Sequence, residues 1–162
     1  MEDYVVAENR KVDGYELGLY AIFDGHSGRN VAKYLQAHLF DNILNEVHGH
    51  HCPQPQPEAF SSSLRNVPRV DGQLAMSRAF GDARLKDHIS SEPDLKIVTI
   101  DRDDTDSIIL ASDGLWKVMS NQDACDCIRG VEDPKEAAKT LIAEALARGS
   151  KDDISCIVVM ID

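Results

Sequence analysis

The stretch Leu-Tyr-Ala-Ile-Phe-Asp-Gly-His-Ser-Gly at residues 19–28 decides how this chain is interpreted. Its apolar first half stops abruptly at Asp24, Gly25 and His26. Short apolar runs with aromatic and branched side chains are typical of a strand covered on both faces. The Asp-Gly pair then forces a turn, and glycine lets the backbone approach a ligand closely. The stretch predicts a buried strand that delivers chemistry at its end, although by itself it also fits an ordinary hairpin turn.

Two further stretches place carboxylates at the ends of expected strands. The apolar residues 108–111 are followed by Ser-Asp-Gly, which contains Asp113, and the apolar residues 154–161 are preceded by Asp152 and Asp153. If the last strand runs antiparallel to the other two in one sheet, all three carboxylate groups gather at the same edge. Clustered carboxylates repel one another, so we expect this edge to hold a cation or to raise a pKa.

Composition narrows the classes of function. A chain of 162 residues has room for one domain with its own core, and we expect a single domain over residues 1–162. The formal charge of −11 argues against a nucleic-acid partner. No apolar run approaches the roughly 20 residues that span a bilayer, so no membrane insertion is expected. The four cysteines show neither paired metal spacing nor a disulfide framework, which favours a reducing location in the cytoplasm and/or nucleus.

Local signals predict the remaining elements. Val12-Asp13-Gly14-Tyr15 is a plausible hairpin turn, and residues 95–100 alternate like a strand. Apolar residues recur at helical spacing over 29–47, with Ser27 as a reasonable cap. Ser120 with Asp123 predicts a helix through residue 129. Asp133 followed by proline and glutamate predicts another helix to about residue 147, ended by Gly149.

Two further stretches have features of metal-binding segments. Residues 48–66 begin with a His/Cys cluster and continue with proline, glutamine and serine, so we interpret them as an irregular linker, the alternative being a zinc site. The acidic residues 101–106 resemble the start of a calcium-binding loop. Position six of that loop is Asp106 instead of glycine and position twelve is Ser112 instead of glutamate, so we expect an exposed hairpin loop.

The expected edge of aspartates makes an all-oxygen site, which suits Mg²⁺ or Mn²⁺ better than zinc or copper. Two such ions a few ångströms apart can bind a phosphate and turn a bridging water into a nucleophile at neutral pH. His26 is placed to give a proton to a leaving alkoxide, and its other interpretation is a histidine of a surface turn.

At this point the motifs resemble those of a known family, the metal-dependent serine/threonine protein phosphatases of type 2C, and of its plant members in particular. The motifs that carry the resemblance are Met-Glu-Asp at 1–3, Phe-Asp-Gly-His-Ser-Gly at 23–28, Val-Asp-Gly-Gln-Leu-Ala-Met-Ser-Arg-Ala-Phe-Gly-Asp at 70–82, Ala-Ser-Asp-Gly-Leu-Trp at 111–116 and Gly-Ser-Lys-Asp-Asp-Ile-Ser at 149–155. They occur in the family's order and are very specific.

The resemblance implies an α+β fold, in which an antiparallel β-sandwich is flanked by helices and carries a site for two ions, Mg²⁺ or Mn²⁺, on one edge. It implies a signalling hydrolase that removes phosphate from phosphoserine and phosphothreonine in proteins by means of a water that bridges the two metals. Its site residues, as the resemblance assigns them, are Asp24 as the bridging ligand, Gly25 as a ligand through its carbonyl, Asp113 and Asp152 on the second ion, Glu2 acting through metal-bound water, and His26 as the general acid.

The chain also departs from the family's pattern. A Gly-Ser-Thr motif and a Gly-Asp-Ser-Arg motif, which relatives carry on central strands, do not occur between residues 47 and 67. The arginine that holds substrate phosphate in the family would precede Met1, and Lys117 stands where many relatives have an acidic residue. We therefore expect a sandwich truncated by loss of central strands, whose remaining apolar faces are less well covered.

Two functions follow from these observations. Retention of every carboxylate of the motif favours a working phosphatase. Loss of the central segment favours a catalytically impaired relative that binds phosphoproteins or protein kinases and regulates them.

Overall fold

The computed structural model describes residues 2–26, 28–47, 70, 78–81, 84–85 and 87–161. Its contacts divide the chain into two compact units, one made of Met1–Leu44 with Ile100–Asp162 and the other of Asn45–Thr99. The expectation of a single domain over residues 1–162 stays a prediction.

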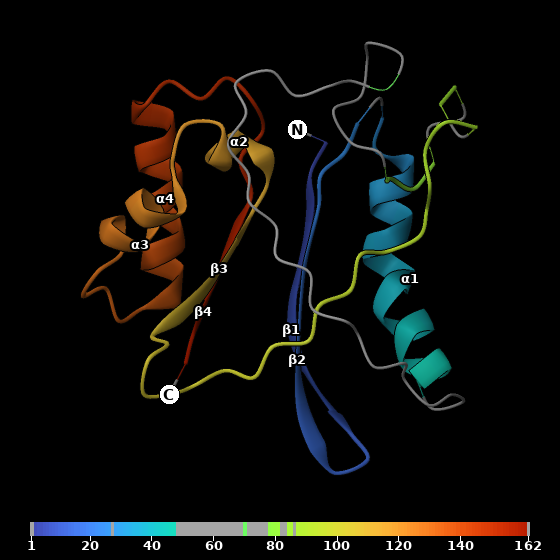
Figure 1. Ribbon diagram of the computed structural model, residues 1–162, viewed down its shortest axis with the longest axis horizontal. Coiled ribbons are helices and arrows are strands. Elements are labelled where there is room, and N and C mark those ends of the chain that lie inside the picture. Colours follow the sequence, from blue (N-terminus) through green and yellow to red (C-terminus); the bar gives the residue numbers. More distant parts are fainter. Residues whose placement is uncertain are drawn as a thin grey trace. The chain divides into compact units, whose positions relative to one another are not determined.

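The first unit begins with a hairpin of β1 (Tyr4–Val12) and β2 (Tyr15–Phe23), shown in blue in Figure 1. The strands are antiparallel, and Val12 pairs with Tyr15 across a two-residue turn. Asp13 and Gly14 both have positive φ, 50° and 87°, as the twist of a tight hairpin requires. The predicted turn is confirmed. The prediction that residues 19–23 form a strand buried on both faces is wrong. Phe23 is the buried residue of β2, and the other residues of this strand are half-buried or exposed.

A second sheet joins β3 (Ser107–Ala111) to β4 (Cys156–Met160), which are antiparallel and pair Ala111 with Cys156. The expected direction of the last strand relative to residues 108–111 is confirmed. The expectation that the strand before Asp24 belongs to the same sheet is wrong, because β2 pairs with β1 in a separate sheet. Residues of β2 also approach both β3 and β4, so the two small sheets contact each other. The chain is α+β, with small antiparallel sheets and helices, as the resemblance predicts.

Four helices complete this unit: α1 (Asn30–Val47), the single turn α2 (Asp113–Trp116), α3 (Asn121–Cys127) and α4 (Pro134–Ala147). Ser120 and Asp123 form a reciprocal capping box at α3, which ends two residues before the predicted position. Asp133 accepts a hydrogen bond from the Glu136 N–H at the start of α4. Gly149, with φ of 86°, follows the end of α4 as predicted.

The buried core of this unit lies among α2, α3, α4 and β4. Leu115 and Leu141 are fully buried, and α4 packs along β4. The other members of this cluster are small or flexible apolar residues: Met119, Ala124, Ile128, Ala137, Ala145 and Val158. This core lies directly behind the turn that starts with Asp113, and it therefore fixes the backbone of that turn.

In the second unit, the predicted strand at residues 95–100 is wrong. Residues 91–100 are irregular and exposed, with Leu95, Ile97 and Val98 at 66%, 68% and 63% of full exposure. A strand is stable only when a neighbour satisfies its backbone groups, and no described strand lies beside these residues. The described order here is a parallel bridge between Arg78 and Ser90 and a turn around the buried Leu85.

Some expectations fall outside the described residues, namely the Ser27 cap, the linker at 48–66 and its alternative zinc site. Residues 101–104 form the expected exposed turn, in which Asp101 accepts a hydrogen bond from the Asp103 N–H. That turn precedes β3 but does not close a hairpin, since residues 95–100 form no strand. Among the described residues, no helix has the length and apolarity needed to cross a membrane.

Candidate metal site

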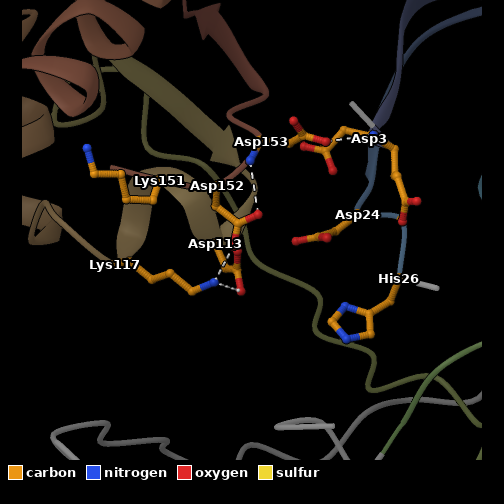
Figure 2. A pocket seen from close by; sticks show the side chains of 10 residues that line it. Asp3, Asp24, His26, Asp113, Lys117, Lys151, Asp152 and Asp153 are labelled. Carbon is orange, nitrogen blue, oxygen red and sulfur yellow. Dashed lines mark hydrogen bonds and ion pairs between the residues drawn. The ribbon is translucent and has the colours of Figure 1, made fainter. Parts of the chain in front are cut away.

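A polar pocket of about 340 Å³ lies within the first unit (Figure 2). All six residues assigned to the site from the sequence line it, together with four that were not assigned to it. The predicted residues are Glu2, Asp24, Gly25, His26, Asp113 and Asp152, and the others are Asp3, Lys117, Lys151 and Asp153. Residues more than a hundred positions apart in the sequence thus share one pocket.

Antiparallel pairing in the hairpin brings the N-terminal residues to the end of β2. Tyr4 pairs with Phe23, so Glu2 and Asp3 lie beside the residues that follow β2. The backbones pass so closely that a Cβ on Gly25 would lie 2.3 Å from the Glu2 carbonyl oxygen. Glycine is therefore required at position 25. The Glu2 carboxylate in turn accepts a hydrogen bond of 3.2 Å from the Gly28 N–H.

The other side of the pocket is built on the second sheet. The pairing of Ala111 with Cys156 places the turn after β3 next to the loop before β4. A Cβ on Gly114 would lie 2.0 Å from the Asp153 carbonyl oxygen, so this position also excludes a side chain. The Ser112 hydroxyl accepts a hydrogen bond of 2.9 Å from the Ser155 N–H, and both serines are buried. This side of the pocket has its backbone locked in place.

One hydrogen bond joins the two sides. The Glu2 N–H donates to the Asp153 carboxylate at 2.6 Å. The first residues of the chain and the loop before β4 are thereby held together at the pocket rim.

Crowding of negative charge is visible at Asp24. Burial raises the pKa of its carboxyl group, and the negative charges of Asp113, Asp3 and Asp152 raise it further, although the Asp113 N–H lowers it. In Figure 2 the Asp24 carboxylate lies between the carboxylates of the two sides. The raised pKa agrees with the expectation that clustered carboxylates would perturb one another.

Lys117 offsets part of this charge. Its ammonium group lies 2.8 Å from an Asp113 oxygen and 2.6 Å from an Asp152 oxygen (Figure 2). The hydrogen bond from Lys117 is the main reason why the pKa of Asp152 is lowered, and the two carboxylates together raise the pKa of Lys117. All three side chains remain about half exposed, so water screens the ion pairs.

The donor atoms that line the pocket are of the kind that a hard divalent cation prefers. Six carboxylates line it, and oxygen ligands are those that Mg²⁺ and Mn²⁺ prefer. One Asp3 carboxylate oxygen is buried and has no hydrogen-bond partner among the described residues, which is costly unless a further group satisfies it. As the side chains stand, no three His, Cys, Asp or Glu side chains among the described residues converge closely enough to hold an ion. Side-chain movements would be needed to hold an ion, and Lys117 is the cation that Asp113 and Asp152 contact in this structure.

The other four lining residues were not assigned to the site from the sequence, although Asp153 had been noted beside Asp152 and Lys117 as a departure from the family's pattern. Asp3 and Asp153 adjoin predicted residues in the Met-Glu-Asp and Asp-Asp motifs, so adjacency was a usable signal. Lys117 follows Asp113 by four positions, which places both side chains on one face of a helical turn. Lys151 carried no comparable signal. His26 is exposed at the pocket and lowers the pKa of Asp152 through its charge.

Comparison with known proteins adds an independent observation. The family model described as Protein phosphatase 2C matches residues 58–154. The chain is 42% identical to Probable protein phosphatase 2C 58 of Arabidopsis thaliana, with 98% of this chain and 82% of the relative covered. It is 40% identical to Probable protein phosphatase 2C 62 of Oryza sativa subsp. japonica, with 98% and 81% covered. Both relatives are plant proteins, as the resemblance predicts.

A solved structure, serine-threonine phosphatase 2C from Toxoplasma gondii, is also similar, with a TM-score of 0.49 and 21% identity over 98% of this chain and 52% of that one. That likeness is too distant to add to the argument.

The alignment with the Arabidopsis relative is longer than this chain. It spans 233 positions, whereas the chain has 162 residues, so about 70 positions of the relative face no residue here. The relatives therefore contain about 70 positions that this chain lacks, which is consistent with the expected truncation.

Proposed function

The chain belongs to the protein phosphatase 2C family, and we propose that it hydrolyses phosphoserine and phosphothreonine in proteins with two divalent cations, Mg²⁺ or Mn²⁺, bound at the pocket described above. The observation that carries the proposal is the gathering of Glu2, Asp24, Asp113 and Asp152 around one pocket. Phosphoproteins are the substrates that the family implies. Protein kinases as partners, and a location in the cytoplasm and/or nucleus, belong to the same proposal.

Each side of the pocket would supply ligands. On the hairpin side these are the Asp24 carboxylate and the Gly25 carbonyl, and on the sheet side they are Asp113 and Asp152. Glu2 would act through water and would keep its position through the Gly28 N–H. When bound, two such ions supply a hydroxide nucleophile at neutral pH and offset the charge of the phosphate.

His26 would act on the leaving group. It follows Asp24 by two residues and lines the same pocket while remaining accessible to solvent. A protonated imidazole there can donate its proton to the serine or threonine oxygen as the phosphorus–oxygen bond breaks. That oxygen leaves as a neutral hydroxyl, which is a far better leaving group than an alkoxide.

The test is release of phosphate from a phosphothreonine peptide by the purified full chain, with Mn²⁺, with chelator, and with Asp113→Asn. Losing one carboxylate ligand removes several kcal/mol of charge stabilisation, so the rate should fall by about 10²-fold or more. Asp24→Asn should have the same effect, with the chain still folded by circular dichroism. Unchanged activity in both variants would refute the site assignment.

A second candidate function is supported by the segment of about 70 positions that the relatives have and this chain lacks. In this alternative the chain is a catalytically impaired relative that binds phosphoproteins or kinases. A folded protein that binds the phosphothreonine peptide in the presence of Mn²⁺ but releases no phosphate would establish it over the first candidate.

A further inference from the structure

Lys117 lines the pocket, but the proposed function gives it no role. Its ammonium group bridges the carboxylates of Asp113 and Asp152, the two residues assigned to the same cation. A positive charge thus already lies where both carboxylates direct their oxygens, at 2.8 and 2.6 Å (Figure 2).

The backbone holds this arrangement in place. Asp113 is the first residue of α2, and the Lys117 N–H donates to the Asp113 carbonyl oxygen at 2.9 Å, which closes the turn. The lysine side chain therefore starts one turn away from the Asp113 carboxylate, on the same face. Asp152 is brought to this turn by the β3–β4 pairing and by the close passage of Gly114 against Asp153. The ion pair follows from the fold of the well-packed side of the pocket.

Lys117 lowers the affinity of the pocket for a cation, although the pocket as a whole is negatively charged. Six carboxylates and two lysines line the pocket, so its net charge remains negative and attractive to a divalent ion. An ion that takes oxygens from both Asp113 and Asp152 has to separate them from the ammonium group first. The free energy of breaking the two ion pairs is then subtracted from the free energy of binding the ion.

We propose that Lys117 is a tethered counter-ion that competes with the divalent cation for Asp113 and Asp152, holding these two carboxylates together before the ion binds and weakening metal affinity. This inference rests on the proposed function, because it takes Asp113 and Asp152 as metal ligands. It assigns Lys117 a role in setting the metal concentration at which the enzyme is loaded.

The experiment is a Mn²⁺ titration of the full chain followed by the electron paramagnetic resonance signal of free Mn²⁺, which needs no catalysis. Lys117→Met removes the ammonium group and keeps the length of the side chain. Two exposed ion pairs are lost, so the Kd for Mn²⁺ should fall by between about twofold and thirtyfold. Lys117→Arg keeps a charged donor and should bind Mn²⁺ about as weakly as the natural chain.

Lys151→Met is the matched control. Lys151 lines the same pocket and carries the same charge but makes no ion pair with the described residues. Its loss reports the general effect of removing one positive charge from the pocket. The proposal requires the Kd to fall distinctly further in Lys117→Met than in Lys151→Met.

A second measurement is thermal unfolding with chelator and with saturating Mn²⁺. Without metal, Lys117→Met leaves two carboxylates facing each other and should lower the Tm. With Mn²⁺ the difference from the natural chain should vanish or reverse, whereas a purely structural lysine would lower the Tm equally in both conditions.

The outcomes separate this inference from the proposed function. Binding of Mn²⁺ with the same or a higher Kd in Lys117→Met, or an equal gain in Lys151→Met, overturns the inference and leaves the metal site intact. Absence of Mn²⁺ binding in every protein, including the natural chain, overturns both.

Discussion

The two sides of the pocket differ in how firmly the rest of the chain supports them. The sheet side, from β3 to β4 with α2, α3 and α4, contains most of the buried apolar residues, including the fully buried Leu115 and Leu141. In the hairpin and α1, the described residues that are buried and apolar are Phe23 and Ala32. The large apolar side chains of α1 that the structure describes are half-buried or exposed, with Tyr34 at 60% and Ile43 at 45%.

This difference indicates where the missing segment matters. The backbone that carries Asp113 on the sheet side is supported by the buried core of α2, α3, α4 and β4. The aspartates of the hairpin side depend on a two-stranded ribbon, which is only marginally stable without further packing. The partly buried Glu2–Asp153 hydrogen bond and the exposed Arg10–Asp41 ion pair support the hairpin. We therefore expect the hairpin side to be the part of the site that a bound cation orders most.

The largest expected effect tests the strong side. Leu141→Ala removes a fully buried side chain from the core that supports Asp113, and it should cost about 2–5 kcal/mol of unfolding free energy. Tyr34→Ala, on exposed α1, should change it by less than about 0.5 kcal/mol. Urea unfolding followed by circular dichroism measures both. Similar losses in the two variants would contradict the contrast between the two sides.

The two glycines of the pocket provide a paired test. Gly114→Ala would press a Cβ to 2.0 Å from the Asp153 carbonyl oxygen in the locked part of the backbone, so we expect a loss of about 1–3 kcal/mol or more. Gly25→Ala would approach the Glu2 carbonyl oxygen at 2.3 Å. Glu2 can move, since it belongs to the loosely packed side, so this change should cost less stability but weaken Mn²⁺ binding.

Mn²⁺ titration and urea unfolding of the two glycine variants test this prediction. The comparison fails if Gly25→Ala destabilises the chain as much as Gly114→Ala does. It also fails if Gly25→Ala leaves the Kd for Mn²⁺ unchanged.

Sequence reasoning succeeded where the signals were local. The Asp13-Gly14 turn, the Ser120 capping box and the start of α4 after Asp133 all depend on residues within four positions of one another. Strand ends were predictable too, and the meeting of Asp113 with Asp152 follows from the antiparallel pairing of β3 with β4. Asp24 lines the same pocket, but the expected single sheet was wrong, because β2 pairs with β1.

It failed where the outcome depends on distant partners. The alternation in residues 95–100 is typical of a strand, but pairing requires a neighbour that no local pattern reveals. Burial of β2 was overestimated for the same reason. The bridge from Lys117 to Asp152 crosses 35 positions, so the sequence suggested only its nearer half, the contact with Asp113.

A smaller effect tests a feature that the sequence did predict. Ser120→Ala removes the hydroxyl that accepts the Asp123 N–H at the start of α3 and should cost about 1 kcal/mol. Ser120→Asp keeps an acceptor at this position and should retain most of the stability. Urea unfolding again provides the measurement, and a cost below about 0.3 kcal/mol would show that the core of the sheet side carries α3 without its cap.

The smallest expected effect is a change in unfolding free energy whose pH dependence has opposite signs on the two sides of the pocket. The raised pKa of Asp24 means that the folded chain holds this proton more tightly than the unfolded chain, so the stability it contributes is present at low pH and is lost as pH rises above the ordinary value of 3.8. In chelator, Asp24→Asn should therefore stabilise the chain at pH 7 by no more than about 1 kcal/mol, since Asp24 remains open to water.

On the sheet side the sign reverses. The pKa of Asp152 is lowered, chiefly by Lys117, so its stabilisation is present above 3.8 and is lost as pH falls through the lowered value. Asp152→Asn should accordingly destabilise the chain at pH 7. The Asp24→Asn difference should shrink towards pH 4, whereas the Asp152→Asn difference should persist at pH 4, because the lowered pKa of Asp152 lies below 3.8. Unfolding free energies at the two pH values measure them. If both variants change the unfolding free energy in the same direction at pH 7, then the ion pair with Lys117 does not set Asp152 apart from Asp24.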